Sequence, residues 1–418
     1  MNPPMKLPMP APPLIYNLFP LLAGPFPDWI PHLERAREMG FNHLYFNPVS
    51  YPGFSGSLYS VKNHYGFHPM LAPEGDKAAG RALAELLKRM RGTGLTPMMD
   101  LVINHTAIDC PLIEHHPNWY AHDANGRVER PGALHDGHWV EWGDLATVNN
   151  AASPDRDALW DYWDRLVAHH QNLGVQAFRC DAAYQVPVDL WRHLIGRARE
   201  RDPRVAFFAE TLGCPVEDVI ALAGAGFGYT FNSSGWWDYQ EPWCLKQYAE
   251  TRPHAATVAF AESHDTERLA TRVHGDTGLL LARQAFASLF STGMLMPMGL
   301  EFGSRTPMNV VRSRPEDLDR PLDLSGAIGE LIRLKTAHPV FCGEGPMHAV
   351  DASHSHVTAL QKDAQTGSMA ALIQVSRDGQ RGVPEGAPPG WQDAAEVTPD
   401  CLLLHGAPLR VWVRGQAG

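Results

Sequence analysis

The sequence predicts an α/β protein: a (β/α)8 TIM barrel with an inserted loop-rich domain B after strand 3 and a small C-terminal antiparallel β domain. Short apolar runs alternate with amphipathic helical stretches, the alternation stops once after the third strand, and β-rich runs separated by Gly and Pro replace it near the C-terminus. The expected boundaries are 14–105 and 151–339 for the barrel, 106–150 for domain B and 340–414 for the β domain.

The eight expected barrel strands are nearly continuous apolar runs, as in a parallel sheet that helices cover on both faces. Helices are recognised by apolar residues three to four positions apart and by a terminating glycine such as Gly40. The strands are expected at about 14–18, 43–47, 95–102, 175–180, 205–210, 229–231, 257–261 and 294–298, and the main helices at about 27–39, 78–90, 155–173, 188–201, 216–223 and 278–291. The irregular 106–150 stretch is too long for a simple loop, which indicates a subdomain.

Composition excludes several classes of partner. The net charge of −11 over 418 residues argues against nucleic acid or an anionic membrane and fits a neutral polar ligand. The six cysteines form no C-x-x-C pair, which favours a reducing compartment. The proline-rich first residues lack the apolar core of a signal peptide, and no apolar run approaches a membrane span of about 20 residues. A cytoplasmic location is expected, and the oligomeric state is left open.

Polar side chains follow five of the expected strands. Because the carboxyl ends of barrel strands meet at one face, they should share one site. Burying so many charges there without a function would cost several kcal/mol of desolvation. The polar residues at these ends are Asp100, Asn104 and His105, then Arg179 and Asp181, then Glu210, then Glu262, His264 and Asp265, and finally Glu301.

Arg179 and Asp181 are two positions apart on one strand, so their side chains should project together, and the guanidinium should favour the ionised carboxylate. Such a carboxylate can act as a nucleophile, whereas the alternative is a structural ion pair. Glu210 follows Phe207 and Phe208, and an apolar setting would raise its pKa and suit it to acid/base work. An ionised and a protonated carboxyl in one cleft suit glycosidic bond chemistry.

Four segments carry a resemblance to a known family. They read DLVINH (100–105), AFRCDAA (177–183), FFAETLG (207–213) and AESHDT (261–266). In this order they resemble the conserved regions of the α-amylase superfamily, the retaining α-glucan hydrolases and transglycosylases of glycoside hydrolase family 13 type. The likeness covers about residues 14–340.

The resemblance implies a role for each candidate residue. The catalytic three are Asp181 as nucleophile, Glu210 as acid/base and Asp265 as the carboxylate that stabilises the transition state. The substrate-binding set is Tyr59, which stacks on the sugar, His105 and His264, which hydrogen-bond it, Arg179, which orients the nucleophile, and Glu301, as a subsite contact or a loop anchor.

The chain departs from the family pattern at two places, and the second concerns the acceptor. Ser263 replaces the common asparagine, and Tyr184-Gln185 stands where many amylases have Lys-His. The prediction is a retaining α-glycosidase that cleaves α-1,4-type bonds of α-glucan or maltooligosaccharides through a glycosyl-aspartate, with room for transglycosylation. The alternative is a glucanotransferase or maltosyltransferase, and a further alternative is a non-catalytic carbohydrate-binding protein on the same fold.

No metal or cofactor is expected. Asn104 and Asp144 could join a calcium site because that ion takes oxygen ligands, but the 106–150 stretch has no dense aspartate cluster. Calcium therefore remains the alternative.

Overall fold

Eight parallel strands close into a barrel in the order β1-β14-β13-β12-β11-β10-β5-β2. The computed structural model describes residues 11–135, 138–237, 239, 241–352, 354–365, 367, 369–377, 382–383, 386, 388–393 and 408–415. The barrel strands are β1 (Leu14–Leu18), β2 (His43–Phe46), β5 (Thr96–Leu101), β10 (Ala177–Cys180), β11 (Ala206–Glu210), β12 (Tyr229–Phe231), β13 (Ala256–Ala259) and β14 (Gly293–Pro297). The predicted fold class and all eight predicted strands are confirmed.

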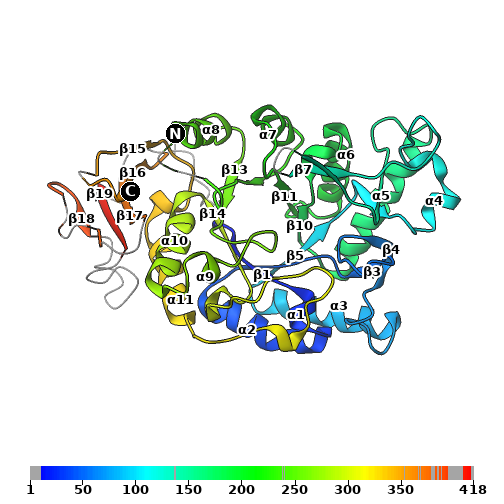
Figure 1. Ribbon diagram of the computed structural model, residues 1–418, viewed down its shortest axis with the longest axis horizontal. Helices are drawn as coiled ribbons and strands as arrows, with labels where there is room; N and C mark the ends of the chain where they lie inside the picture. Colours follow the sequence, from blue (N-terminus) through cyan, green and yellow to red (C-terminus); the bar gives the residue numbers. More distant parts are fainter. Residues whose placement is uncertain are drawn as a thin grey trace, which may run out of the picture.

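Helices surround the barrel on its outside (Figure 1). The longer ones are α2 (Ile30–Met39), α3 (Asp76–Gly92), α5 (Arg156–Leu173), α6 (Val188–Arg201), α7 (Val216–Ala223), α8 (Pro242–Thr251), α10 (Thr277–Phe290) and α11 (Ser325–Ala337). Single turns lie at α1 (Pro20–Ala23), α4 (Leu112–His115), α9 (Leu269–Arg272) and in 3-10 segments at Phe26–Trp29, Pro117–Trp119, Ala183–Gln185, Leu300–Phe302, Pro315–Asp317 and Pro339–Phe341. Gly40 ends α2 in the left-handed conformation, as its sequence position predicts.

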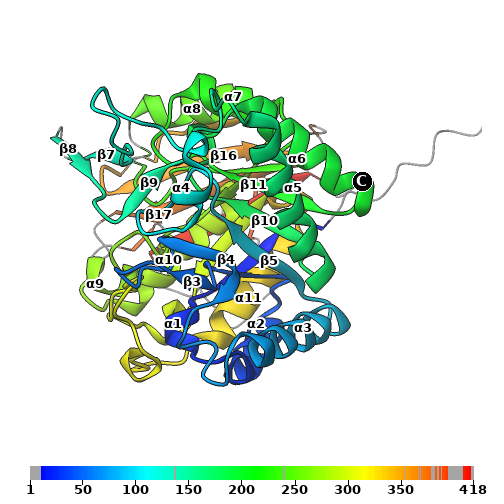
Figure 2. The ribbon, with the colours of Figure 1, turned by 90° about the vertical axis from the view of Figure 1, so that its right-hand side faces the viewer.

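Short two-stranded sheets lie in the segments that follow the carboxyl ends of β2 and β5. After β2, β3 (Ser50–Pro52) pairs with β4 (Val61–Phe67), a hairpin that the turn-like sequence between them did not reveal. In the insertion after β5, β6 (His105–Ala107) pairs with β9 (Leu145–Thr147), and β7 (Gly132–His135) pairs with β8 (His138–Glu141). The β7–β8 hairpin projects away from the barrel (Figure 2).

The C-terminal region forms an antiparallel sheet in the order β15-β16-β17-β19-β18 beside α10 (Figure 1). Its strands are β15 (Met347–Ala349), β16 (Val357–Asp363), β17 (Met369–Ser376), β18 (Gln392–Asp393) and β19 (Leu409–Gly415). Leu360 and Ile373 pack with Phe286 and Phe290 of α10 in one apolar cluster. Parts of the predicted β domain (among them 394–407) and the proline-rich start at 1–10 lie outside the described residues.

Two buried lysines close the C-terminal end of α10. Lys335 Nζ donates to the carbonyl oxygens of Ser288 (2.8 Å), Ser291 (2.8 Å) and Phe341 (2.5 Å), and Lys362 Nζ donates to that of Phe290 (2.8 Å). A cation suits this position because the last carbonyls of a helix carry negative partial charge. Burial lowers the pKa of Lys335 to about 7 and that of Lys362 to about 8. The described helices include none that is both long and apolar enough to cross a bilayer.

Replacing Lys335 with methionine should lower the free energy of unfolding by about 3 kcal/mol, since three buried carbonyl groups lose their donor. Urea unfolding measures the change. Arg333→Met is the control because this side chain, on the same helix, is 64% exposed. Equal stability of the two variants would contradict the assigned role of Lys335.

The contribution of Lys335 should also depend on pH. Its pKa of about 7 in the folded protein lies below the ordinary value of 10.5, so between these values the unfolded chain binds more protons. Stability should therefore rise with pH in this window. The difference in unfolding free energy between wild type and Lys335→Met is expected to grow from about pH 7 to about pH 9. A difference that shrinks over this range would rule out the assigned pKa direction.

Candidate active site

A cleft of about 490 Å³ opens at the carboxyl ends of the barrel strands. Six of the eight residues predicted for the site line it, and a seventh, Arg179, lies beneath it. The lining residues are Ser57, Tyr59, Asn104, His105, Trp142, Asp144, Leu145, Asp181, Ala182, Tyr184, Gln185, Glu210, Leu212, Trp236, His264, Asp265 and Val310.

Arg179 joins three strands at the base of the cleft. Its Nη1 donates to Asp100 on β5 (2.9 Å to Oδ1) and to Asp181 after β10 (2.6 Å to Oδ1), and its Nη2 lies 3.0 Å from Glu210 Oε2 on β11. The parallel register places Arg179 opposite Asp100, which brings these groups together. Burial alone would lower the pKa of Arg179, but Asp100 and Glu210 raise it well above its ordinary value. The guanidinium is therefore permanently charged.

The carboxyls of Asp181 and Glu210 share this guanidinium, so the protonation of one affects the pKa of the other. Burial raises the pKa of both carboxyls, and Arg179 opposes the rise in each case. Asp100 adds a third carboxylate near the same cation, and like charges in a buried site disfavour full ionisation. The arrangement can hold one carboxyl ionised and the other protonated.

The backbone after Asp181 completes the base of the cleft. Ala182 has a positive φ of 39°, an uncommon conformation for a residue with a Cβ. In this conformation its N–H donates to Glu210 Oε2 at 2.6 Å. The strained residue thus connects the end of β10 to the carboxyl of β11.

Asp265 and His264 form the opposite wall. The side chain of Asp265 is 48% exposed to the cleft, and its Oδ2 lies 3.1 Å from His264 Nε2. The rings of His264 and Tyr59 are stacked, with centroids 5.5 Å apart. The Tyr59 hydroxyl donates to Asp100 Oδ2 (2.7 Å), so His264 Nε2, which is 2.6 Å from the same hydroxyl, is the donor in that contact.

His105 is buried on the floor of the cleft. Its Nε2 donates to the carbonyl oxygen of Tyr59 at 3.1 Å, and its Nδ1 has no hydrogen-bond partner among the residues that the structure describes. Burial lowers the pKa of His105 to about 4, so the ring is neutral near pH 7. Nδ1 is then a free acceptor.

Glu301 is not brought to the cleft. It is fully buried, its Oε1 accepts from the Tyr16 hydroxyl (2.6 Å) and its Oε2 accepts from the Gly299 N–H (2.9 Å). Of the two roles expected for Glu301, this position corresponds to the loop anchor, because a side chain with both oxygens occupied inside the fold cannot reach a sugar in the cleft.

Several lining residues were not predicted as site residues. Trp236 is 53% exposed and Trp142 is 37% exposed. Trp142 lies in the irregular 106–150 stretch, where no sequence signal singles it out, whereas Trp236 belongs to a Trp-Trp pair directly after Gly235 that follows a barrel strand, and this position is a usable signal. Tyr184 and Gln185, where the family pattern fails, do line the cleft, and Gln185 Oε1 accepts from Asn104 Nδ2 at 3.1 Å.

The part of the chain that the structure describes contains no set of ligands for the calcium ion that the sequence analysis kept as an alternative. Asn104 Oδ1 is buried without a partner, and Asp144 lines the same cleft. However, no group of three or more His, Cys, Asp or Glu side chains among the described residues is placed to hold a metal. The expected absence of a cofactor stays a prediction.

Comparisons with known proteins agree with this geometry. A family model described as "Glycogen debranching enzyme, glucanotransferase domain" matches residues 14–125. An α-1,4-glucan:maltose-1-phosphate maltosyltransferase of Burkholderia pseudomallei is 30% identical over 383 residues, which make up 88% of this chain and 33% of that protein. The protein of the same name from Pseudomonas aeruginosa is 25% identical over 403 residues, 86% of this chain and 58% of that protein. The chain thus spans less than two thirds of either relative.

Solved structures show the same fold. An α-amylase from Lactobacillus plantarum superposes with a TM-score of 0.76 at 20% identity, covering 96% of this chain and 98% of that one. A cyclic α-maltosyl-(1→6)-maltose hydrolase from Arthrobacter globiformis, in complex with maltose, gives a TM-score of 0.68 at 18% identity, with the same coverage of both chains. The barrel, its insertion and the four ordered motifs thus agree with the resemblance to the α-amylase superfamily, and the solved structures share the fold.

Proposed function

We propose that this protein is a retaining α-glucan transglycosylase that passes a glucosyl or maltosyl unit to a sugar acceptor through a covalent intermediate on Asp181. The observation that carries the proposal is the pair of contacts from one guanidinium to Asp181 (2.6 Å) and Glu210 (3.0 Å) at the base of the cleft. A non-catalytic sugar-binding protein has no need for a nucleophile and an acid on one cation.

In the first step, Asp181 attacks the anomeric carbon while the bond to the leaving oxygen breaks, and that oxygen takes the proton of Glu210. In the second step, Glu210 removes a proton from the acceptor hydroxyl, whose oxygen attacks the same carbon and releases Asp181. Asp265 stabilises the positive charge that develops on the sugar ring. His264 and the ring of Tyr59 position the sugar.

We place transfer ahead of hydrolysis. This reverses the order of the sequence prediction, in which the glycosidase came first and the transferase was the alternative. The named maltosyltransferases among the curated relatives support it. So does the acceptor side of the cleft, where Trp236 and Tyr184 offer aromatic surface and Leu212 and Val310 offer apolar surface. A sugar that packs on such surfaces can displace the water that would otherwise hydrolyse the intermediate. The relatives' donor, maltose 1-phosphate, is a candidate donor here.

Hydrolysis is the second candidate because water can resolve the same intermediate. Incubation with maltooligosaccharides, with and without maltose 1-phosphate, separates the two. Products longer than the substrate would indicate transfer. An increase in these products when maltose 1-phosphate is added would identify that compound as the donor. Shorter products alone would establish a hydrolase and overturn the transfer proposal.

Asp181→Asn should lower turnover by roughly 10⁴-fold, because the amide is a poor nucleophile and glycosyl transfer cannot begin. Initial rates on maltooligosaccharides measure the loss. Asp157→Asn is the matched control, since the side chain of Asp157 is 97% exposed. Full activity of Asp181→Asn would exclude this residue as the nucleophile.

Trp236→Ala should change the fate of the intermediate more than its formation. Loss of a stacking surface worth about 1 kcal/mol should lower the ratio of transfer to hydrolysis by several-fold. Product ratios at fixed acceptor concentration give the readout, with Trp243→Ala as control because Trp243 is 48% exposed and does not line the cleft. An unchanged ratio would remove Trp236 from the acceptor site.

A further inference from the structure

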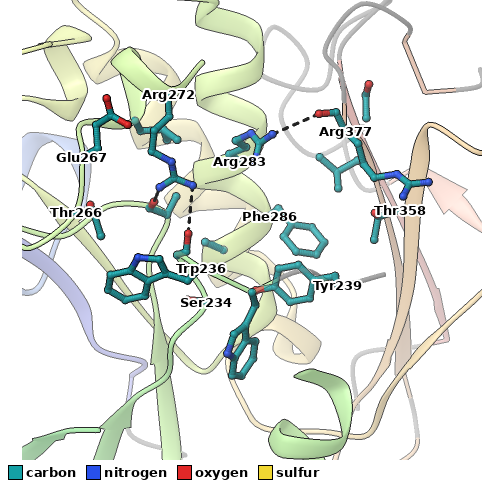
Figure 3. Close-up of a pocket in the computed structure, with 17 residues that line it drawn as sticks. Ser234, Trp236, Tyr239, Thr266, Glu267, Arg272, Arg283, Phe286, Thr358 and Arg377 are labelled. Atoms are coloured by element: carbon teal, nitrogen blue, oxygen red, sulfur yellow. Dashed lines mark hydrogen bonds between the residues drawn. The ribbon is translucent and has the colours of Figure 1, made fainter. Parts of the chain in front are cut away.

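A second cavity, of about 620 Å³, lies between the barrel and the C-terminal sheet (Figure 3). One side is formed by the loops after β12 and β13 with α9, and another by α10. The far side is formed by Thr358 of β16 and by Val375 and Ser376 of β17. Trp236 lines both this cavity and the catalytic cleft. The two spaces are therefore neighbours that share one aromatic wall.

Two arginines give this cavity its charge. Arg272 Nη1 and Nη2 donate to the carbonyl oxygens of Ala261 (3.0 Å) and Gly235 (3.2 Å). Arg283 extends from α10 across the cavity, and its Nη2 donates to the carbonyl oxygen of Arg377 at 3.3 Å (Figure 3). Carbonyl groups are dipoles, so both guanidiniums keep their full positive charge.

No described carboxylate forms an ion pair with Arg272 or Arg283, whereas many other arginines in the same part of the chain have one. Glu267 lies at the rim, is exposed, and contacts neither guanidinium. Burial, together with the charge of Arg272, lowers the pKa of Arg283. Arg283 Nη1 has no acceptor among the described residues.

The rest of the wall is aromatic. Trp236, Tyr239 and Phe286 lie below Arg283 in the view of Figure 3, and Trp237 also lines the cavity. Aromatic faces suit the apolar faces of sugar rings, and a guanidinium with free N–H groups suits a phosphoryl group. An uncharged glucan would leave both cations uncompensated, so the ligand should carry negative charge as well as a ring.

We propose that this cavity binds a phosphorylated sugar, with the phosphoryl group at Arg283 and the ring against the aromatic wall. The site is separate from the Asp181–Glu210 pair, and binding does not require the transfer reaction. Because Trp236 belongs to both spaces, an occupied cavity holds this side chain at the edge of the catalytic cleft.

Glucose 6-phosphate is a suitable probe because its phosphoryl group is not on the anomeric carbon and cannot act as the leaving group of a donor. Calorimetric titration of the full chain should show glucose 6-phosphate binding at least about tenfold more tightly than glucose or inorganic phosphate. Arg283→Met should weaken this binding by about tenfold or more, and Arg283→Lys should restore part of it. Asp181→Asn should bind the probe as the wild type does.

Absence of binding in the wild type, or equal affinity in Arg283→Met, would overturn the proposal. Loss of binding in Asp181→Asn would place the probe in the catalytic cleft and would overturn it too. Equal affinity for inorganic phosphate and glucose 6-phosphate would show that the sugar ring contributes nothing, and would overturn the proposal of a sugar phosphate site. A crystal structure of the wild type with glucose 6-phosphate tests the location even if Arg283→Met does not fold. Binding of glucose 6-phosphate can be measured even if the protein proves inactive on glucans. The binding proposal and the transglycosylase proposal can therefore be refuted independently.

Discussion

The contact on which the site depends is the buried guanidinium of Arg179. It meets Asp100, Asp181 and Glu210, which come from three adjacent strands, and it is almost completely removed from water. A buried cation is tolerable only with such partners, and the carboxylates are tolerable only with the cation. The barrel register places Arg179 opposite Asp100, and Asp181 and Glu210 lie two positions beyond that level at the ends of β10 and β11, so the geometry of the site follows from how β5, β10 and β11 pair. Tyr59 and His264 extend the same network to the wall of the cleft.

The barrel could be predicted because its strands are short apolar runs, and buried parallel strands differ from helices in length and pattern. The helix α11 was missed because Gly326 and Gly329 interrupt its helical signal, and the β3–β4 hairpin was missed because its strands are short or mixed in polarity. Asp181 and Glu210 were predictable from strand ends. Trp236 and Leu212 were not, since loop conformations, which local sequence does not determine, bring them to the cleft. Glu301 looked similar to the other strand-end acids, and only its partner Tyr16, distant in sequence, shows that it points inward.

The junction between the barrel and the C-terminal sheet is built around α10 in two ways. At the end of the helix, Lys335 of α11 and Lys362 of β16 donate hydrogen bonds to the last carbonyl groups, and Lys362 links the sheet to α10. Along its side, Arg283 points into an open space that Thr358 and Val375 border from the sheet. Lys335 donates to three carbonyl oxygens in the packed interior, whereas Arg283 donates to one and borders an open cavity. This difference within one helix distinguishes a structural use of buried cations from a recognition surface.

Ala182 bears on how this scaffold can diversify. Its left-handed backbone holds the peptide after Asp181 in one position, and a β-branched side chain there would clash with its own carbonyl group. The arrangement of Asp181 and Glu210 is therefore set by main chain rather than by any sugar that binds. The loops that carry Trp236, Tyr184 and Val310 can then be mutated without moving the carboxyls of Asp181 and Glu210. A library restricted to those loops, with position 182 left untouched, is the economical route to new acceptors.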